Sequence, residues 1–150
     1  MIANFVFVLA ILGLFIISYL DIKYYEVDWR ILLFTLFVCI IYGWLTYTPV
    51  NLIAAVLIGS FIPVTLTALS HEKWMGWGDV LISVSVSALS GFPGSLIAIS
   101  SAFIVAALFG IIFIKLNKKL KVLPFGPFLV IGALIAKFFG SLIIHLIYAF

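Results

Sequence analysis

Two aspartates stand at the borders of apolar runs, at positions where carboxylates could act as a pair. Asp21 directly follows the uncharged run of residues 2–20, and Asp79 directly precedes an apolar run that begins at Val80. A charge within or against hydrocarbon is expensive, so an acid at such a position is a functional candidate by default. The ordinary alternative is that each aspartate only marks the water boundary at a helix end, with Asp79 acting as a helix N-cap.

A pair of carboxylates in a poorly hydrated site has a characteristic chemistry. The two cannot both ionise easily, so one keeps its proton while the other stays charged. The charged carboxylate can draw a proton from water, and the protonated one can hydrogen-bond a scissile carbonyl and later help the amine leave. Peptide hydrolysis by Asp21 and Asp79 would then need no metal and no cofactor, and we expect neither.

The residues just before the second aspartate support this interpretation. In Gly76-Trp77-Gly78-Asp79, glycines precede the carboxylate by one and by three positions. Glycine permits backbone conformations that other residues resist, and it lets another chain come close. The tetrapeptide is a weak signal alone, and it gains weight from the apolar boundary and from the second aspartate.

The sequence offers no competing catalytic apparatus. It contains neither a His-Glu-x-x-His pattern for zinc nor a serine in a Gly-x-Ser-x-Gly elbow. His71 and His145 are predicted on opposite membrane faces, so they cannot form one site. The single cysteine, Cys39, lies in an apolar run, which excludes an internal disulfide and predicts a small buried hydrophobic residue.

Composition predicts a membrane protein. Of 150 residues, 67% are hydrophobic and 9% are charged, against about 25% charged residues in a soluble domain. A membrane span needs roughly 20 mostly apolar residues, so six spans with short loops use nearly the whole length. We therefore expect one compact, all-α domain over residues 1–150, embedded in the lipid bilayer and without a nucleic-acid partner. The predicted transmembrane helices cover residues 2–20, 31–45 (or to 47), 52–69, 80–90, 95–114 and 128–150.

Charge placement predicts how these spans are oriented. Most of the basic residues fall in three loops on one side, at residues 21–30, 70–79 and 115–121, and the opposite loops contain none. They are Lys23, Arg30, Lys73, Lys115, Lys118, Lys119 and Lys121. By the positive-inside rule these three loops, with Asp21 and Asp79, are cytoplasmic, and both termini lie on the non-cytoplasmic side.

The fourth span is unusually short. Residues 80–89 make about 15 Å of helix, against a hydrocarbon core of about 30 Å, so we expect Asp79 to lie somewhat below the membrane surface. Ser83, Ser87 and Gly91 recur at four-residue spacing, which predicts a stripe where another helix approaches closely. Lys137 lies within the sixth span without an obvious partner, and we expect it either to extend toward the interface or to face a polar interior.

Three segments together carry a resemblance to a known family. They are residues 21–27 (DIKYYEV), residues 76–80 (GWGDV) and residues 124–128 (PFGPF). In these segments and in their spacing over six spans, essentially the whole chain resembles the prepilin peptidases, which are membrane aspartic proteases of the Gly-x-Gly-Asp type.

The resemblance implies an endopeptidase of the cytoplasmic (inner) membrane that removes the short basic leader from type IV prepilin-like precursors. It assigns the catalytic roles to Asp21 and Asp79 and the active-site loop to Gly76 and Gly78. The partners implied are prepilin-like membrane proteins. The candidate substrate-binding residues are Glu26, Asp28, Glu72, Pro124, Phe125, Gly126 and Pro127. The three acids could attract a basic leader by charge or form an ordinary solvated face, and the Pro-Phe-Gly-Pro segment could hold an extended substrate or be a plain helix-start turn.

The sequence departs from the family pattern in three ways. Asp28 stands where the family often has proline, and Leu81 stands where it often has lysine. The large bacterial members also carry a cytoplasmic methyltransferase insert with paired cysteines after the first span, whereas only a ten-residue loop is expected here. We therefore expect the short, peptidase-only form, and the two substitutions bear on substrate preference more than on chemistry.

Two other classes of function stay open at the level of sequence. Carboxylates inside a membrane also mark ion paths, so a small proton- or ion-coupled transporter is one alternative. It predicts acids near the bilayer midplane and paired discontinuous helices, whereas here the acids cluster at one face. The other alternative is a catalytically inactive relative that serves as a membrane scaffold.

Overall fold

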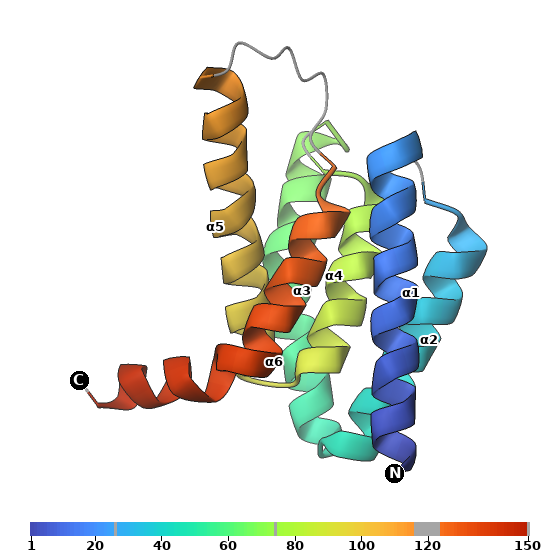
Figure 1. The fold of residues 1–150 in the computed structure, drawn as a ribbon, viewed down its shortest axis with the longest axis vertical. Helices are drawn as coiled ribbons and strands as arrows, with labels where there is room; N and C mark the ends of the chain where they lie inside the picture. The colour runs from blue at the N-terminus through green and yellow to red at the C-terminus, as the bar shows by residue number, and fades with distance from the viewer. Residues whose placement is uncertain (26, 74, 116–123, 150) are drawn as a thin grey trace.

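The computed structural model describes residues 1–25, 27–73, 75–115 and 124–149, and within them the chain is all-helical, as predicted. Within these residues, six helices follow one another along the chain (Figure 1). They are α1 (Ile2–Tyr24), α2 (Trp29–Thr46), α3 (Pro49–Ser70), α4 (Trp77–Ser90), α5 (Gly94–Lys115) and α6 (Gly126–Tyr148). Glu26 and the basic residues Lys118, Lys119 and Lys121 lie outside the described residues.

Five of these helices, all except α4, are long and apolar enough to cross a membrane. Because most of their large apolar side chains point outward, as Phe5, Phe37 and Phe61 do, their surface suits lipid rather than water. The prediction of a multi-pass membrane protein is confirmed at this level. The remaining helix, α4, has 14 residues and is about 21 Å long, so it is short as expected.

Several predicted boundaries were wrong by two to four residues, and two of them concern the aspartates. Asp21 was expected to open a polar loop, but α1 continues through it to Tyr24. Asp79 was expected to end a loop, but α4 begins before it, at Trp77. Hydropathy marks where a chain leaves hydrocarbon, whereas a helix ends where its backbone groups find other partners. At the end of α1, Tyr25 adopts the left-handed conformation at φ 57 and its N–H is donated to the Asp21 carbonyl.

Helix α4 lies at the centre of the bundle and contacts each of the other five helices. Ser83 and Ser87 are fully buried on it, and the predicted close approach is confirmed. A Cβ atom at Gly59 of α3 would collide with the Ser87 side chain, and one at Gly43 of α2 would lie 2.7 Å from the Ala88 carbonyl oxygen. Small residues therefore let α2 and α3 pack directly against the helix that carries Asp79.

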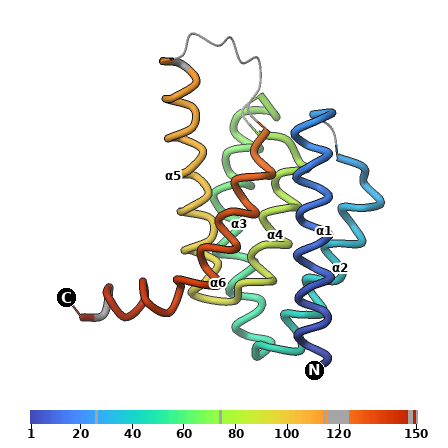
Figure 2. Tube along the Cα trace, viewed as in Figure 1, coloured from blue at the N-terminus to red at the C-terminus, as the bar shows by residue number. Residues whose placement is uncertain are grey.

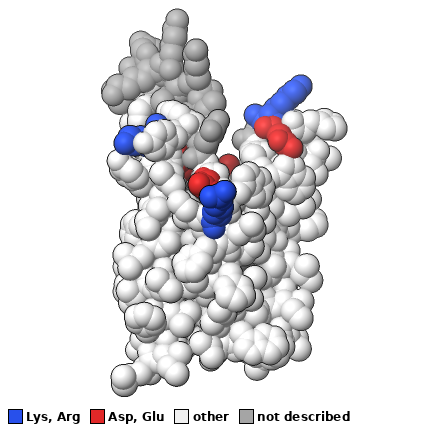
Figure 3. All heavy atoms as spheres, turned by 90° about the vertical axis from the view of Figure 1, so that its right-hand side faces the viewer, with Lys and Arg blue, Asp and Glu red and all other residues white. Residues whose placement is uncertain are grey.

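Apart from Lys137 of α6, the described Asp, Glu, Lys and Arg residues lie at one end of the bundle (Figure 3). Lys23 and Arg30 lie at the adjoining ends of α1 and α2, Lys73 follows α3, and Lys115 ends α5. At the opposite end, Asn51 forms two hydrogen bonds with the backbone of Phe92, at 2.8 and 2.9 Å. The C-terminal part of α6 turns sideways, away from the bundle (Figure 2).

Candidate active site

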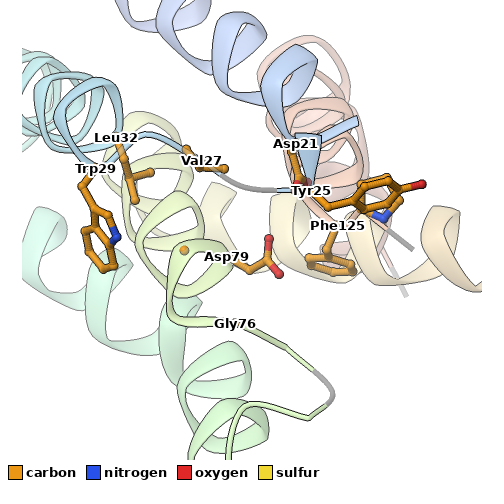
Figure 4. Close-up of a pocket in the computed structure, with 10 residues that line it drawn as sticks. Asp21, Tyr25, Val27, Trp29, Leu32, Gly76, Asp79 and Phe125 are labelled. Carbon is orange, nitrogen blue, oxygen red and sulfur yellow. The ribbon is translucent and has the colours of Figure 1, made fainter. Parts of the chain in front are cut away.

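A pocket of about 420 Å³ lies at the charged end of the bundle. Its walls come from the end of α1, the connection to α2, the first turn of α2, the start of α4 and the segment before α6 (Figure 4). The lining residues are Asp21, Tyr25, Val27, Trp29, Leu32, Gly76, Gly78, Asp79, Pro124 and Phe125. The structure thus brings into one pocket the two aspartates that the sequence singled out.

Asp21 occupies the last turn of α1 and is only 9% exposed. Its Oδ2 accepts a hydrogen bond of 2.9 Å from the backbone N–H of Gly126, which is 105 residues away. Gly126 is the first residue of α6, and the N-terminus of a helix carries partial positive charge that favours an anion. A Cβ atom at Gly126 would lie 2.8 Å from the same Oδ2, so this contact depends on glycine.

Asp79 lies in the first turn of α4 and is half-buried. The interpretation of Asp79 as the helix N-cap was wrong, because the N-cap is Gly76, which has no side chain to cap the helix. The Asp79 carboxylate instead accepts a hydrogen bond from the Gly76 backbone N–H, in the way that an acid at the third helical position reaches back in a capping box. The Gly76-Trp77-Gly78-Asp79 motif therefore holds the side chain of its own aspartate through the Gly76 N–H.

The charge of Asp21 influences the ionisation of Asp79. Asp79 lies outside the five long apolar helices, and burial, followed by the nearby charge of Asp21, raises its pKa from 3.8 to about 7 against the lowering effect of the Gly76 hydrogen bond. Loss of a proton is unfavourable for a desolvated acid beside a like charge. Near neutral pH the pair can therefore hold one proton and one negative charge.

The two glycines of the motif leave the pocket open. Both line it, but neither is demanded by packing, since a Cβ at Gly78 would meet nothing within 4 Å and one at Gly76 only the Gly78 nitrogen at 4.0 Å. The backbone of Gly76, with φ −84, is also ordinary. Two roles were expected for these glycines, an unusual backbone conformation and close approach of another chain. Only the second is consistent with this geometry.

The Pro-Phe-Gly-Pro segment divides between the pocket and the helix. Pro124 and Phe125 line the pocket. The Phe125 ring packs against the Phe103 ring, with 4.9 Å between the two ring centroids. Gly126 and Pro127 are the first two residues of α6, so for them the simple helix-start interpretation holds. The segment therefore combines a pocket wall with a backbone donor to Asp21.

The other predicted residues lie outside this pocket. Asp28 is the N-cap of α2, where its Oδ1 accepts the Arg30 N–H at 2.8 Å; it lines a neighbouring open hollow of about 510 Å³. Glu72 is exposed beyond α3, and Glu26 is not among the described residues. Leu81, which replaces the family's lysine, packs against the hydrophobic core rather than lining the pocket.

Sequence reasoning missed the apolar wall of the pocket, formed by Val27, Trp29 and Leu32. A signal is present in the sequence, since Val27 and Trp29 are apolar residues within the predicted polar loop of residues 21–30. Among the described residues, no group of three or more His, Cys, Asp or Glu side chains is placed to hold a metal ion.

The part of the chain that matches a known protein family includes both aspartates. Residues 8–111 match the type IV leader peptidase family. A prepilin leader peptidase/N-methyltransferase of Legionella pneumophila is 38% identical over 73 residues, which make up 47% of this chain and 25% of that protein. The chain thus spans about a quarter of the length of this curated relative, and no solved structure gives a significant match. Since the family match covers more than half of the sequence, the chain belongs to the type IV leader peptidase family.

Proposed function

We propose that this protein is a membrane-embedded aspartic endopeptidase that removes the leader from prepilin-like precursors, with Asp21 and Asp79 as the catalytic pair. The observation that carries the proposal is the meeting of these two carboxylates in one pocket at the charged end of an apolar bundle. The family match supports peptide cleavage. The aspartic mechanism rests on the chemistry of the pocket.

The ionisation of Asp79 suggests a division of labour between the carboxylates. Burial and the nearby charge of Asp21 raise the pKa of Asp79 to about 7, so we assign the proton of the pair to Asp79 and the negative charge to Asp21, which accepts the Gly126 N–H. Asp21 would take a proton from a water whose oxygen attacks the scissile carbonyl carbon. Asp79 would hydrogen-bond the carbonyl oxygen as negative charge develops there. The C–N bond then breaks as the leaving amine takes up the proton that Asp21 accepted from the water, which returns Asp21 to its charged form and leaves a new carboxyl group.

The surroundings of the pair suit an extended peptide. The bare backbone at Gly76 and Gly78 leaves room beside Asp79, and Val27, Trp29 and Leu32 offer an apolar wall. The hollow that contains Asp28 shares Val27 and Trp29 with the pocket. A basic leader would therefore pass over Asp28, whose charge complements it.

We assign the pocket to the cytoplasmic face of the inner membrane. Among the described residues, Lys23, Arg30, Lys73 and Lys115 all lie at the same end as the pocket. The excess of basic residues on cytoplasmic loops is what sets orientation in multi-pass proteins. Cleavage would then occur where the leader of a precursor meets the membrane.

The proposal is tested by co-expression with candidate prepilins. The near-isosteric variants Asp21→Asn and Asp79→Asn should each lower leader removal by at least about 10³-fold, because each deletes one half of an acid–base pair. Glu72→Gln, which removes an exposed acid outside the pocket, should process normally. All variants should be recovered in the membrane fraction. Leader removal that persists in both aspartate variants would refute the catalytic assignment.

A further inference from the structure

Lys137 is a cation in the middle of α6, away from the charged end of the bundle. Its partners are aromatic: Nζ donates a hydrogen bond to the Tyr42 hydroxyl at 3.2 Å, lies 4.7 Å from the centroid of the Phe7 ring, and lies 5.8 Å from that of Tyr42. The sequence showed no obvious partner for Lys137, and the structure supplies these aromatic ones. Neither aromatic residue carries a negative charge.

A second cavity, of about 220 Å³, lies beside this lysine. Its lining comes from the second turn of α1, the residue after α2, the end of α4 and the middle of α6. The lining residues are Phe7, Tyr47, Leu89, Ser90, Ala133, Ala136 and Lys137. The space equals that of about seven water molecules in the liquid, and none of its lining residues belongs to the aspartate pocket.

The electrostatics of this cavity call for an anion. The described acids are Asp21, Asp28, Glu72 and Asp79, and all lie at the other end of the bundle. A lysine within a membrane span usually pairs with a carboxylate or with backbone carbonyls, because an isolated charge there is unfavourable. An ammonium has three donors, and the structure accounts for one, to Tyr42.

The lining also indicates which anion would fit. The Tyr47 hydroxyl donates its proton to the Leu89 carbonyl at 3.2 Å, so Lys137 and the Ser90 hydroxyl are the donors for a guest. Phe7, Leu89, Ala133 and Ala136 are apolar. Lys137 is itself exposed, and the next residues on α6, Phe138 and Phe139, are 71% and 55% exposed on a surface suited to acyl chains.

We propose that the Lys137 cavity binds the phosphate of an anionic phospholipid from the leaflet opposite the aspartate pocket. The Lys137 ammonium pairs with the phosphate oxygens, and the Ser90 hydroxyl donates to them. The apolar lining contacts the glycerol and the first methylene groups. The chemistry shared with a soluble phosphate ester is the phosphate group itself, and the apolar surroundings favour the lipid.

Thermal unfolding of the purified full-length chain in phosphatidylcholine nanodiscs tests the proposal. Adding phosphatidylglycerol should raise the Tm of the wild type and of Lys137→Arg by about 5 °C. Lys137→Met keeps the length of the side chain but removes the charge, so its Tm should not respond. Lys73→Met, which removes an exposed cation at the other end, should respond like the wild type. An undiminished response in Lys137→Met would overturn the proposal.

Two further experiments follow. The first identifies the source of the phosphate, and the second tests the proposal with a variant that keeps the charge of Lys137. Glycerol 3-phosphate in place of the lipid should leave the Tm unchanged, and a shift equal to that with phosphatidylglycerol would overturn the lipid assignment. Ala136→Leu fills the cavity and leaves the charge in place, so native mass spectrometry should show retained phosphatidylglycerol on the wild type and at least tenfold less on this variant. Equal retention on both would place the lipid elsewhere.

Discussion

At the end of the bundle that holds Asp21 and Asp79, the ionisable groups are held by backbone N–H donors, whereas at the other end Lys137 is held by aromatic side chains. In both places the contacting group carries a partial charge opposite to that of the ionised side chain. A helix N-terminus presents partial positive charge to a carboxylate, and the face of an aromatic ring presents partial negative charge to an ammonium. Backbone donors leave the pocket free for a substrate, while the rings fill space around the lysine.

The two aspartates also differ from each other. Asp79 lies in the first turn of its own helix, where the helix dipole favours a carboxylate. Asp21 lies in the last turn of α1, where the dipole disfavours it, and the start of α6 supplies the missing donor. Asp21 therefore depends on a distant segment, and Asp79 on its own neighbours. This difference predicts that changes in the Pro-Phe-Gly-Pro segment act on Asp21.

Among changes outside the two aspartates, the largest effect is expected from Gly126→Ala. The added Cβ would lie 2.8 Å from Asp21 Oδ2, so the carboxylate must move away from its donor, and leader removal should fall by about 100-fold. The Tm should change little, because the end of a side chain can shift. Gly110→Ala, where an added Cβ meets nothing within 4 Å, is the matched control. Normal activity of Gly126→Ala in a cleavage assay would contradict the inference that Asp21 depends on the Gly126 N–H.

The next effect concerns the helix that carries Asp79. Gly59→Ala places a Cβ against Ser87 and 3.0 Å from the Cβ of Ser95, so α3 and α4 must separate, which costs about 1–3 kcal/mol. Chemical denaturation in detergent should show this loss, whereas Gly110→Ala should be neutral or slightly stabilising because alanine favours helix. Equal stability of the two variants would mean that the contact between α3 and α4 is not tight.

The pH dependence of leader removal tests the assignment of Asp79 as the acid and Asp21 as the base. Below a pKa of about 7 Asp79 carries its proton, and above it both carboxylates are charged and the proton donor is lost. Leader removal should therefore decline on the alkaline side, approaching about tenfold per pH unit well above the pKa. On the acidic side it should fall again once Asp21 is protonated. A kcat/KM that keeps rising through pH 9 would contradict a protonated Asp79 as the acid.

The fold was largely predictable and the details of the site were not, for a physical reason. Hydropathy and charge reflect transfer between water and lipid, so they predicted the helices and the charged end, whereas the pairing of the aspartates also needed the Gly76-Trp77-Gly78-Asp79 motif and the family resemblance. They carry no information on hydrogen bonds between distant segments, such as Gly126 to Asp21 or Lys137 to Tyr42. They also placed Asp21 in a loop, because a charged residue can leave hydrocarbon while its backbone remains helical.

The smallest effect separates the two roles of Asp28. As the N-cap of α2 it accepts the Arg30 N–H, and its charge lies beside the hollow that we assign to the leader. Asp28→Asn preserves the cap, so its stability should stay unchanged while KM for a basic leader rises several-fold. Asp28→Ala should show the same rise in KM and lose about 1 kcal/mol of stability in addition. If Asp28→Asn cleaves basic and neutral leaders with unchanged KM, Asp28 serves only to begin α2, and selection of the leader rests on residues nearer the aspartate pair.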